Sequence, residues 1–131
     1  MSMPVPVQSN SAPQAIGAYS QGMVHDGLLY LSGQIPLDPV SGRMVEGDFA
    51  LQIRQVLDNL QAVCAAAGGR LQNAIKLQVY LTDLGHFAQV NQAMEAEFAS
   101  PYPARAVVQV AALPRGAQVE IDGIVALGEA D

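Results

Sequence analysis

A regular stripe of apolar side chains marks residues 49–67 as the clearest helix in the chain. Apolar residues recur there at spacings of three and four, which places them along one side of an α-helix. Asp48 is suited to cap the start of this helix, and Gly68 and Gly69 are suited to end it. The stripe consists of Phe49, Ile53, Val56, Leu60, Val63 and Ala67.

The same spacing predicts a second helix that ends near Phe98. Thr82 or Asp83 would cap its start, and Pro101 and Pro103 follow its end, where proline stops a helix. The residues expected to face the core are Phe87, Val90, Met94 and Phe98.

A β-hairpin is predicted in the first third of the chain. Residues 18–24 form its first arm, a tight turn follows at Asp26 and Gly27, and residues 28–35 form its second arm. The second arm begins with residues that are apolar on both faces, so it should be buried on both sides. Residues 5–7 are a candidate for a short edge strand.

Three further strands are predicted in the second half of the chain. Residues 74–81 alternate between apolar and polar side chains, which is typical of a strand with one buried face. Residues 105–110 and 118–126 are two more strands, joined by a turn at residues 114–116. Residues 36–47 carry turn-forming proline and glycine and are expected to be a loop. The face of residues 74–81 expected to be buried carries Leu77, Val79 and Leu81.

This order of elements predicts one α+β domain over residues 1–131. It should contain a single mixed sheet of about six strands with both helices on one face. The other face, with Tyr80, Val107, Val119 or their alternates, then has no helix to cover it. Association with further subunits is the economical way to cover that face.

The composition supports one globular domain and reduces the number of partner classes to be expected. The chain has 131 residues, of which 50% are hydrophobic and only 14% charged, so disorder is excluded and much apolar surface must be covered. The formal net charge is −6, and because no Lys/Arg cluster offsets it, nucleic acid is not expected as a partner. The single Cys64 excludes an internal disulfide and indicates a reducing compartment.

The beginning of the chain carries no charged residue before His25. A secretory leader is nevertheless not expected, because a basic segment is missing and Pro4, Pro6 and Pro13 interrupt the apolar residues. No stretch is long and apolar enough to span a membrane. The expectation is therefore a cytoplasmic protein without a membrane partner.

The chain lacks the sequence motifs that several enzyme classes require. The glycine pair at 68–69 is followed by neither Lys-Ser nor Lys-Thr, so it is not a phosphate-binding loop. His25 and His86 lack the spacing of a zinc site, and no metal site is predicted. Ser32 lacks the preceding glycine of a nucleophile elbow. Cys64 lies beside the apolar stripe and is expected to be a core side chain.

The remaining polar candidates each have an ordinary structural alternative. Arg105 opens a strand and would be a surface arginine, unless it is buried between subunits and needs a carboxylate from protein or ligand. Glu120 lies in an apolar strand, and with Asp122 on the same face it could belong to a solvated face. The full set is Tyr19, Ser32, Gly33, Asn91, Arg105 and Glu120.

Residues 103–121 carry the most specific motif. They read Pro-Ala-Arg-Ala-Val-Val-Gln-Val-Ala-Ala-Leu, then Pro-Arg-Gly-Ala-Gln and Val-Glu-Ile. This stretch resembles the signature of the RidA (YjgF) family of imine deaminases. The resemblance covers nearly the whole chain in order. Further similar blocks are residues 16–21, 32–36, 57–60, 79–84 and 90–91.

The resemblance implies a chorismate-mutase-like fold assembled as a homotrimer, with clefts between the subunits. It implies hydrolysis of reactive 2-imino acids, such as 2-iminopropanoate and 2-iminobutanoate, to 2-oxo acids and ammonia. Such imines arise from enamines that pyridoxal-phosphate enzymes release, so the implied role is metabolite damage control. The implied ligand is a small 2-imino or 2-oxo acid, and no cofactor or metal is implied.

The resemblance also implies roles for the candidate residues. Arg105 would hold the substrate carboxylate with two parallel hydrogen bonds, and Glu120 would position a water and move its proton. Backbone N–H groups near Gly33 and Val107 would bind the imine nitrogen or the nascent oxygen. Tyr19, the third catalytic candidate, would close the cleft and supply a hydroxyl.

Ser32 and Asn91 would line or support the same cleft by resemblance. The chain departs from the family pattern at Ala18, where proline is common, and at Val107, where cysteine or serine is common. Ala18 removes no functional group. At Val107 the backbone contact survives, whereas any contribution or regulation by a thiol is lost. The departures therefore bear on rate and substrate preference.

Two alternatives from other classes stay open. One is a non-catalytic trimeric binding or regulatory protein for small 2-oxo or carboxylic acids, which would use Arg105 without turnover. Glu120 favours the enzyme, because catalysis needs a base and simple carboxylate binding does not. The other is RNA cleavage or a chaperone role, and the net charge of −6 argues against RNA.

Overall fold

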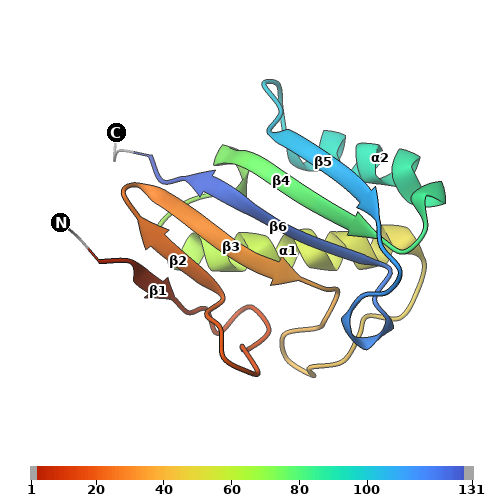
Figure 1. The fold of residues 1–131 in the computed structure, drawn as a ribbon, viewed down its shortest axis with the longest axis horizontal. Helices are drawn as coiled ribbons and strands as arrows, with labels where there is room; N and C mark the ends of the chain where they lie inside the picture. The colour runs from red at the N-terminus through yellow and green to blue at the C-terminus, as the bar shows by residue number, and fades with distance from the viewer. Residues whose placement is uncertain (1–2, 129–131) are drawn as a thin grey trace.

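The computed structural model describes residues 3–128; the outermost residues of the predicted domain, 1–2 and 129–131, lie outside the described residues. The chain forms one six-stranded sheet in the order β1-β2-β3-β6-β4-β5 (Figure 1). The strands are β1 (Val5–Val7), β2 (Gly22–His25), β3 (Leu28–Gln34), β4 (Ala74–Leu81), β5 (Ala104–Gln109) and β6 (Val119–Ala126).

The sheet is mixed, as predicted. Strands β4 and β5 pair in parallel, and every other neighbouring pair is antiparallel. A parallel pair needs a crossover connection, which the second helix supplies between β4 and β5. This arrangement makes β5 one edge of the sheet and β1 the other.

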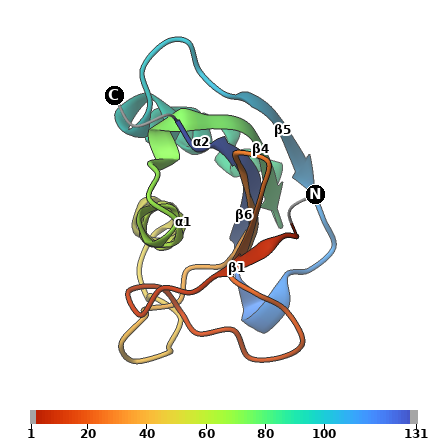
Figure 2. The ribbon, with the colours of Figure 1, turned by 90° about the vertical axis from the view of Figure 1, so that its left-hand side faces the viewer.

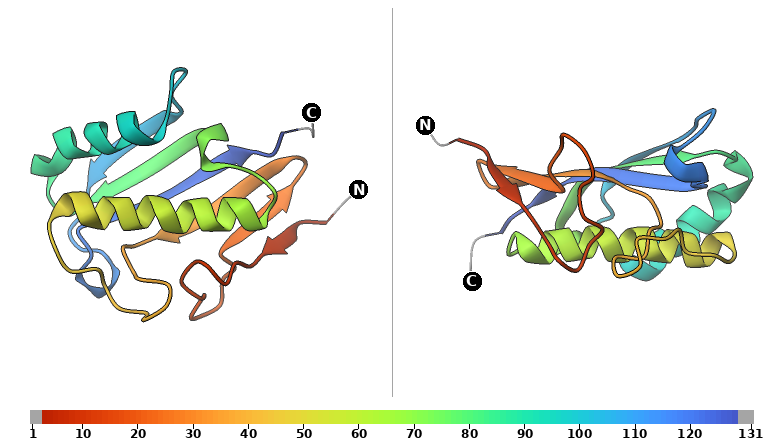
Figure 3. Two further views of the ribbon diagram at one scale, coloured as in Figure 1. Left: turned by 180° about the vertical axis from the view of Figure 1, so that it is seen from behind. Right: turned by 90° about the horizontal axis from the view of Figure 1, so that it is seen from below.

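Two helices, α1 (Phe49–Ala66) and α2 (Phe87–Glu97), lie on the same face of the sheet (Figures 2 and 3). The prediction of one α+β sheet with both helices on one face is confirmed. Three short 3₁₀ turns complete the fold, at Leu71–Asn73, Leu84–His86 and Pro114–Gly116. None of the described helices is long and apolar enough to cross a membrane.

Helix α1 follows the predicted apolar stripe closely. The Asp48 side chain accepts a hydrogen bond of 3.1 Å from the N–H of Leu51, and Gly68 leaves the helix with φ +81°. The lone Cys64 is fully buried, and this burial raises the pKa of its thiol to about 12, so it is a core side chain as expected. The core between α1 and the sheet includes Ile53, Val56, Leu60, Leu77, Val79 and Ile121.

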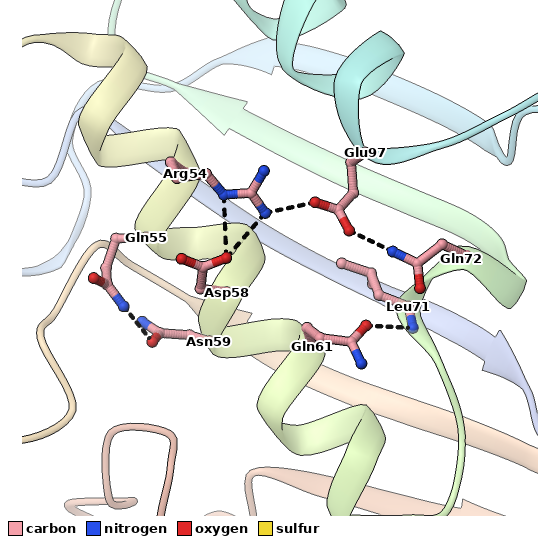
Figure 4. Close-up of polar contacts among 8 residues, drawn as sticks. All are labelled: Arg54, Gln55, Asp58, Asn59, Gln61, Leu71, Gln72 and Glu97. Atoms are coloured by element: carbon pink, nitrogen blue, oxygen red, sulfur yellow. Dashed lines mark hydrogen bonds and ion pairs between the residues drawn. The ribbon is translucent and has the colours of Figure 1, made fainter.

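Polar side chains join α1 to the end of α2 and to the turn that precedes β4 (Figure 4). Arg54 donates to Asp58 one turn along α1 and, at 2.5 Å, to Glu97 at the end of α2. The other carboxylate oxygen of Glu97 accepts from Gln72, and Gln61 of α1 accepts from the N–H of Leu71 at 2.9 Å. These contacts link the two helices to each other and to the turn before β4.

The first strand of the hairpin is shorter than predicted. The sequence predicted a strand over residues 18–24, whereas β2 begins at Gly22 and extends to His25. Before Gly22 the backbone keeps one bond to β3, from the N–H of Ser32 to the carbonyl of Gln21. The carbonyl of Ser20 instead accepts from the Ser32 hydroxyl, and the Gln21 side chain binds the N-terminal loop. This irregular segment carries Tyr19 out to the surface.

The second helix also differs from its prediction. Asp83 caps a 3₁₀ turn rather than the α-helix, and α2 starts only at Phe87. Phe87 was expected to face the core, but it is 42% exposed, whereas Val90 and Met94 are buried as predicted. The 3₁₀ turn has three residues per turn and so rotates the start of α2 relative to a continuous α-helix.

The face that the helices leave open differs in part from the prediction. Val119 is fully buried on the helix side, and Val107 packs against the same core. Tyr80 does lie on the open face, where its register partners are Val108 of β5 and Glu120 of β6. Local alternation identifies two faces of a strand, but the packing of α1 and α2 decides which one is covered.

Candidate functional site

The candidate residues fall into two groups on opposite faces of the sheet. Arg105 pairs in register with the buried Leu77, so its side chain shares the helix-covered face. Glu120 pairs with Tyr80 and alternates with the buried Val119 and Ile121, which places it on the open face. Arg105 therefore does not lie on the open face of the sheet that further subunits were expected to cover.

Arg105 lies in a cavity of about 450 Å³ between β5 and α2. Its guanidinium carbon is 5.4 Å from the ring centroid of Phe87, a cation–π contact with the exposed ring at the start of α2. Within residues 3–128, Arg105 makes no ion pair with a carboxylate. Its polar face is thus open to an anion from elsewhere. The cavity is lined by Asn91, Met94, Glu95, Tyr102, Pro103 and Arg105.

Val107 lies on the edge strand β5, and its side chain does not line the Arg105 cavity. The N–H of Val110 donates to the carbonyl of Leu81 at 2.8 Å. Along a parallel strand the backbone groups alternate between the two sides, so those of Val107 point to the outer edge of the sheet. That edge is where a ligand or a second chain would meet them.

Glu120 lies in a second cavity, of about 520 Å³, on the other face. The structure brings Tyr19, Ser32, Gly33 and Glu120 together there, although they come from three separate segments of the chain. Asn91 and Arg105 belong to the first cavity, so one subunit does not unite all the candidates.

Gly33 makes room for the carboxylate of Glu120. The pairing of β3 with β6 shifts register between Leu31 and Gln34, a β-bulge that contains Gly33. A Cβ placed on Gly33 would lie 2.0 Å from Oε2 of Glu120, so any side chain there would force the carboxylate to move. The observed position of the Glu120 carboxylate therefore requires glycine at position 33.

The carboxyl of Glu120 is harder to ionise than an ordinary glutamate. Burial raises the pKa of Glu120, and the negative charge of Asp122 on the same face raises it further. The hydroxyl of Tyr80 donates to Oδ2 of Asp122 at 3.0 Å, which holds Asp122 in place. Burial likewise raises the pKa of Tyr80, with the hydrogen bond to Asp122 next in effect.

Tyr19 is 52% exposed at the rim of this cavity. The Ser32 hydroxyl donates to the carbonyl of Ser20 at 2.5 Å, which ties the Tyr19 segment to β3. The buried side chain of Gln21 accepts from the N–H of Ser9 at 2.6 Å and donates to the carbonyl of Pro13 at 2.7 Å. Ser32 and Gln21 thus position the segment that carries Tyr19.

Sequence reasoning missed three polar residues near Glu120. Asp122 and Tyr80 were noted only as members of a sheet face, and Arg115 only as part of a turn. Arg115 lines the Glu120 cavity. Its place in the Pro114–Gly116 turn carries no signal by itself; only its position within the 103–121 motif singles it out.

The histidines do not form a metal site in the described part of the chain. His86 stacks on Phe49 with ring centroids 4.3 Å apart and hydrogen-bonds to Gln89. Within residues 3–128, no three His, Cys, Asp or Glu side chains come together in a group that could hold a metal ion.

Known proteins resemble this chain over most of its length. A family model described as Endoribonuclease L-PSP matches residues 9–127. Protein DfrA of Myxococcus xanthus is 49% identical over 90% of this chain and 92% of its own. The 2-iminobutanoate/2-iminopropanoate deaminase of Rattus norvegicus is 43% identical over 93% of this chain and 89% of its own.

A solved structure agrees with both the sequence and the fold. The crystal structure of RidA from an Antarctic Psychrobacter species has a TM-score of 0.89 and 46% identity, covering 93% of this chain and 98% of that one. The resemblance inferred from the 103–121 motif is confirmed. The chain belongs to the Endoribonuclease L-PSP family, the RidA (YjgF) family.

Proposed function

We propose that this protein hydrolyses small 2-imino acids to 2-oxo acids and ammonia, at sites formed between the subunits of a cytoplasmic homotrimer. Relatives named 2-iminobutanoate/2-iminopropanoate deaminase at 42–43% identity support this activity. The observation that carries the proposal is Glu120, a carboxyl with a raised pKa in a cavity of about 520 Å³.

Arg105 binds the substrate carboxylate in this proposal. A guanidinium presents parallel N–H groups that match the two oxygens of a carboxylate. Arg105 has no carboxylate partner within residues 3–128 and rests on the ring of Phe87, so its polar edge is presented outward. Two hydrogen bonds to the carboxylate fix the adjacent C=N carbon for attack.

Glu120 is the base and then the acid. It takes a proton from a water molecule as the water oxygen bonds to the imine carbon and the C=N electrons move to nitrogen. It returns that proton to the nitrogen, which gives a carbon that carries a hydroxyl and an amino group. It then takes the hydroxyl proton and passes it to the amino nitrogen, so that the carbon–nitrogen bond breaks and ammonia leaves as the carbon–oxygen double bond forms. A raised pKa suits these transfers, because it makes the carboxyl a stronger base and keeps its proton available for return. Backbone N–H groups near Gly33 and Val107 stabilise the developing charge.

A second copy of the chain completes the site in this proposal. Arg105 and Glu120 lie on opposite faces of one sheet and line separate cavities. A single substrate of three or four carbons cannot contact both in one subunit. Packing the open face against the β5 edge of a neighbour brings the two residues to one cleft and covers the face that lacks helices.

The experiment couples the purified protein to a threonine dehydratase and traps free imine with semicarbazide. Wild type should suppress trapping, and Glu120→Gln should lose roughly 100-fold or more of this activity. Glu46→Gln, an exposed carboxylate of the 36–47 loop, is the matched control. Full activity in Glu120→Gln would overturn the proposed mechanism.

Binding without turnover is the rival outcome. If wild type binds pyruvate through Arg105 but does not reduce trapping, the protein is a binding or regulatory protein instead. Light scattering tests the assembly, for which a trimer is expected. A stable monomer that is fully active would contradict the shared site.

A further inference from the structure

Arg115 is a cation of the Glu120 cavity that the proposed reaction does not use. It lies in the Pro114–Gly116 turn just before β6, and its exposed side chain lines the same cavity as Glu120 and Tyr19. Its Nη1 donates to the carbonyl of Gly42 at 3.1 Å. This bond joins the guanidinium to the 36–47 loop.

The remaining N–H groups of Arg115 are available to an anion. A guanidinium has five N–H donors, and only the Nη1 contact to Gly42 is found for Arg115 within residues 3–128. No carboxylate of the described residues pairs with it. Among the residues that line this cavity, Glu120 supplies the negative charge and would repel a second carboxylate, whereas Arg115 supplies the positive charge that would attract it.

The backbone of Arg115 also has an unusual conformation. Its backbone has φ +58° and ψ 24°, a left-handed conformation that arginine rarely adopts. Such a conformation persists where the surrounding structure holds it, and the other end of the Arg115 side chain is bound to Gly42.

The cavity has room for more than a small imino acid. Its volume of about 520 Å³ is in the range of pockets that hold ligands much larger than a three- or four-carbon acid, roughly 300–1,000 Å³. The wall is mixed: Ile16, Ile35 and Leu37 are apolar, whereas Gln14 and Arg115 are polar. A charged group therefore has a defined place at the Arg115 end.

We propose that Arg115 holds the distal carboxylate of a dicarboxylic 2-imino acid, while Arg105 of a second copy holds the carboxylate next to the imine carbon. The inference rests on the proposed function and names a substrate class for it. Arg115 is then a specificity-determining residue, since it contacts the far end of the substrate and not the reacting carbon.

The test compares two probes that differ in the distal carboxylate. Calorimetry measures the Kd of 2-oxoglutarate and of 2-oxobutanoate, and an amino-acid oxidase supplies the corresponding imines from glutamate and 2-aminobutanoate for hydrolysis. The variants are Arg115→Asn, which tolerates positive φ, and Arg115→Lys, which keeps the charge. Arg43→Asn, an exposed arginine of the 36–47 loop that lines no described cavity, is the control.

The expected result is a change in preference. In Arg115→Asn the Kd ratio and the kcat/KM ratio should both shift about tenfold or more against the dicarboxylic probe. Arg115→Lys should recover part of the preference, and Arg43→Asn should match wild type. A charge reversal, Arg115→Glu, should favour an imine with a cationic distal group.

Three results would overturn the inference. They are unchanged ratios in Arg115→Asn, an equal loss for both probes, and wild-type protein that binds neither probe. Failure of the proposed function is a separate result. In that case wild type binds the dicarboxylic probe through Arg115 but hydrolyses neither imine.

Discussion

Gly33 and Glu120 share one small volume of the molecule. A Cβ at position 33 would lie 2.0 Å from Oε2 of Glu120, so the carboxylate occupies the space that any side chain there would need. The β3 bulge between Leu31 and Gln34 brings the glycine to this point. The position of the proposed base thus depends on a residue without a side chain.

Gly33→Ala should therefore reduce activity more than stability. The clash is with the flexible end of Glu120, which can turn away, so the chain should still fold with a Tm within a few degrees of wild type. A displaced base should cost about 100-fold in kcat for imine hydrolysis. Gly128→Ala, where an added Cβ meets nothing within 4 Å, is the control. Wild-type kcat in Gly33→Ala would refute the pairing.

The acid limb of the pH profile should follow the pKa of Glu120. The base acts when ionised, so activity is lost as pH falls through a pKa that lies above the ordinary glutamate value. Asp122→Asn removes the charge that helps to raise this pKa, and the limb of kcat/KM should move to lower pH. Tyr19 and Arg115 of this cavity, and Tyr80 beside Glu120 on the sheet, stay unchanged in the variant. An unmoved limb in Asp122→Asn would mean that Asp122 does not tune the base.

Glu120→Gln should stabilise the protein at neutral pH while it abolishes activity. The folded state holds the Glu120 proton more tightly than the unfolded chain, because the folded pKa is raised. Stability therefore falls as pH rises from the ordinary glutamate pKa through the raised one. Differential scanning calorimetry should find a higher Tm for the variant at pH 7 and no difference below the ordinary pKa. A lower Tm at pH 7 would contradict this sign.

The contact between Arg105 and Phe87 should affect substrate binding. The ring lies 5.4 Å from the guanidinium carbon, and an exposed cation–π contact contributes roughly 0.5–1 kcal/mol. Phe87→Leu should raise KM about two- to fivefold with little change in kcat. Leu84→Ala, a similarly exposed apolar residue of the preceding turn, is the control. A fall in kcat at constant KM would assign Phe87 a different role.

Two inactive variants should restore each other when mixed. If Arg105 and Glu120 of different copies form each site, a trimer built from Arg105→Ala and Glu120→Gln chains contains some complete sites. Each site needs one chain of each kind in a fixed order, so random assembly should recover about a quarter of wild-type activity. The measurement is activity after joint refolding. No recovery would place the whole site within one subunit.

Local patterns determined most of the secondary structure. The stripe in residues 49–67 predicted α1 because helical spacing is a property of neighbouring residues alone, and the alternation in β4 predicted its buried face for the same reason. The 103–121 motif led to the family without any structure. Where long-range contacts replace local ones the sequence failed, as at residues 18–21, whose polar groups bond to Ser32 and to the N-terminal loop.

The tertiary structure alone decided how the candidate residues are grouped. Alternation showed that Arg105 and Glu120 each lie on one face of a strand, but the register of β5 against β4 and the packing of the helices set them on opposite faces. The fit of Gly33 to Glu120 and the place of Arg115 beside them also depend on segments far apart in the chain. A side chain's neighbours across a sheet are set by strand pairing, which no local pattern specifies.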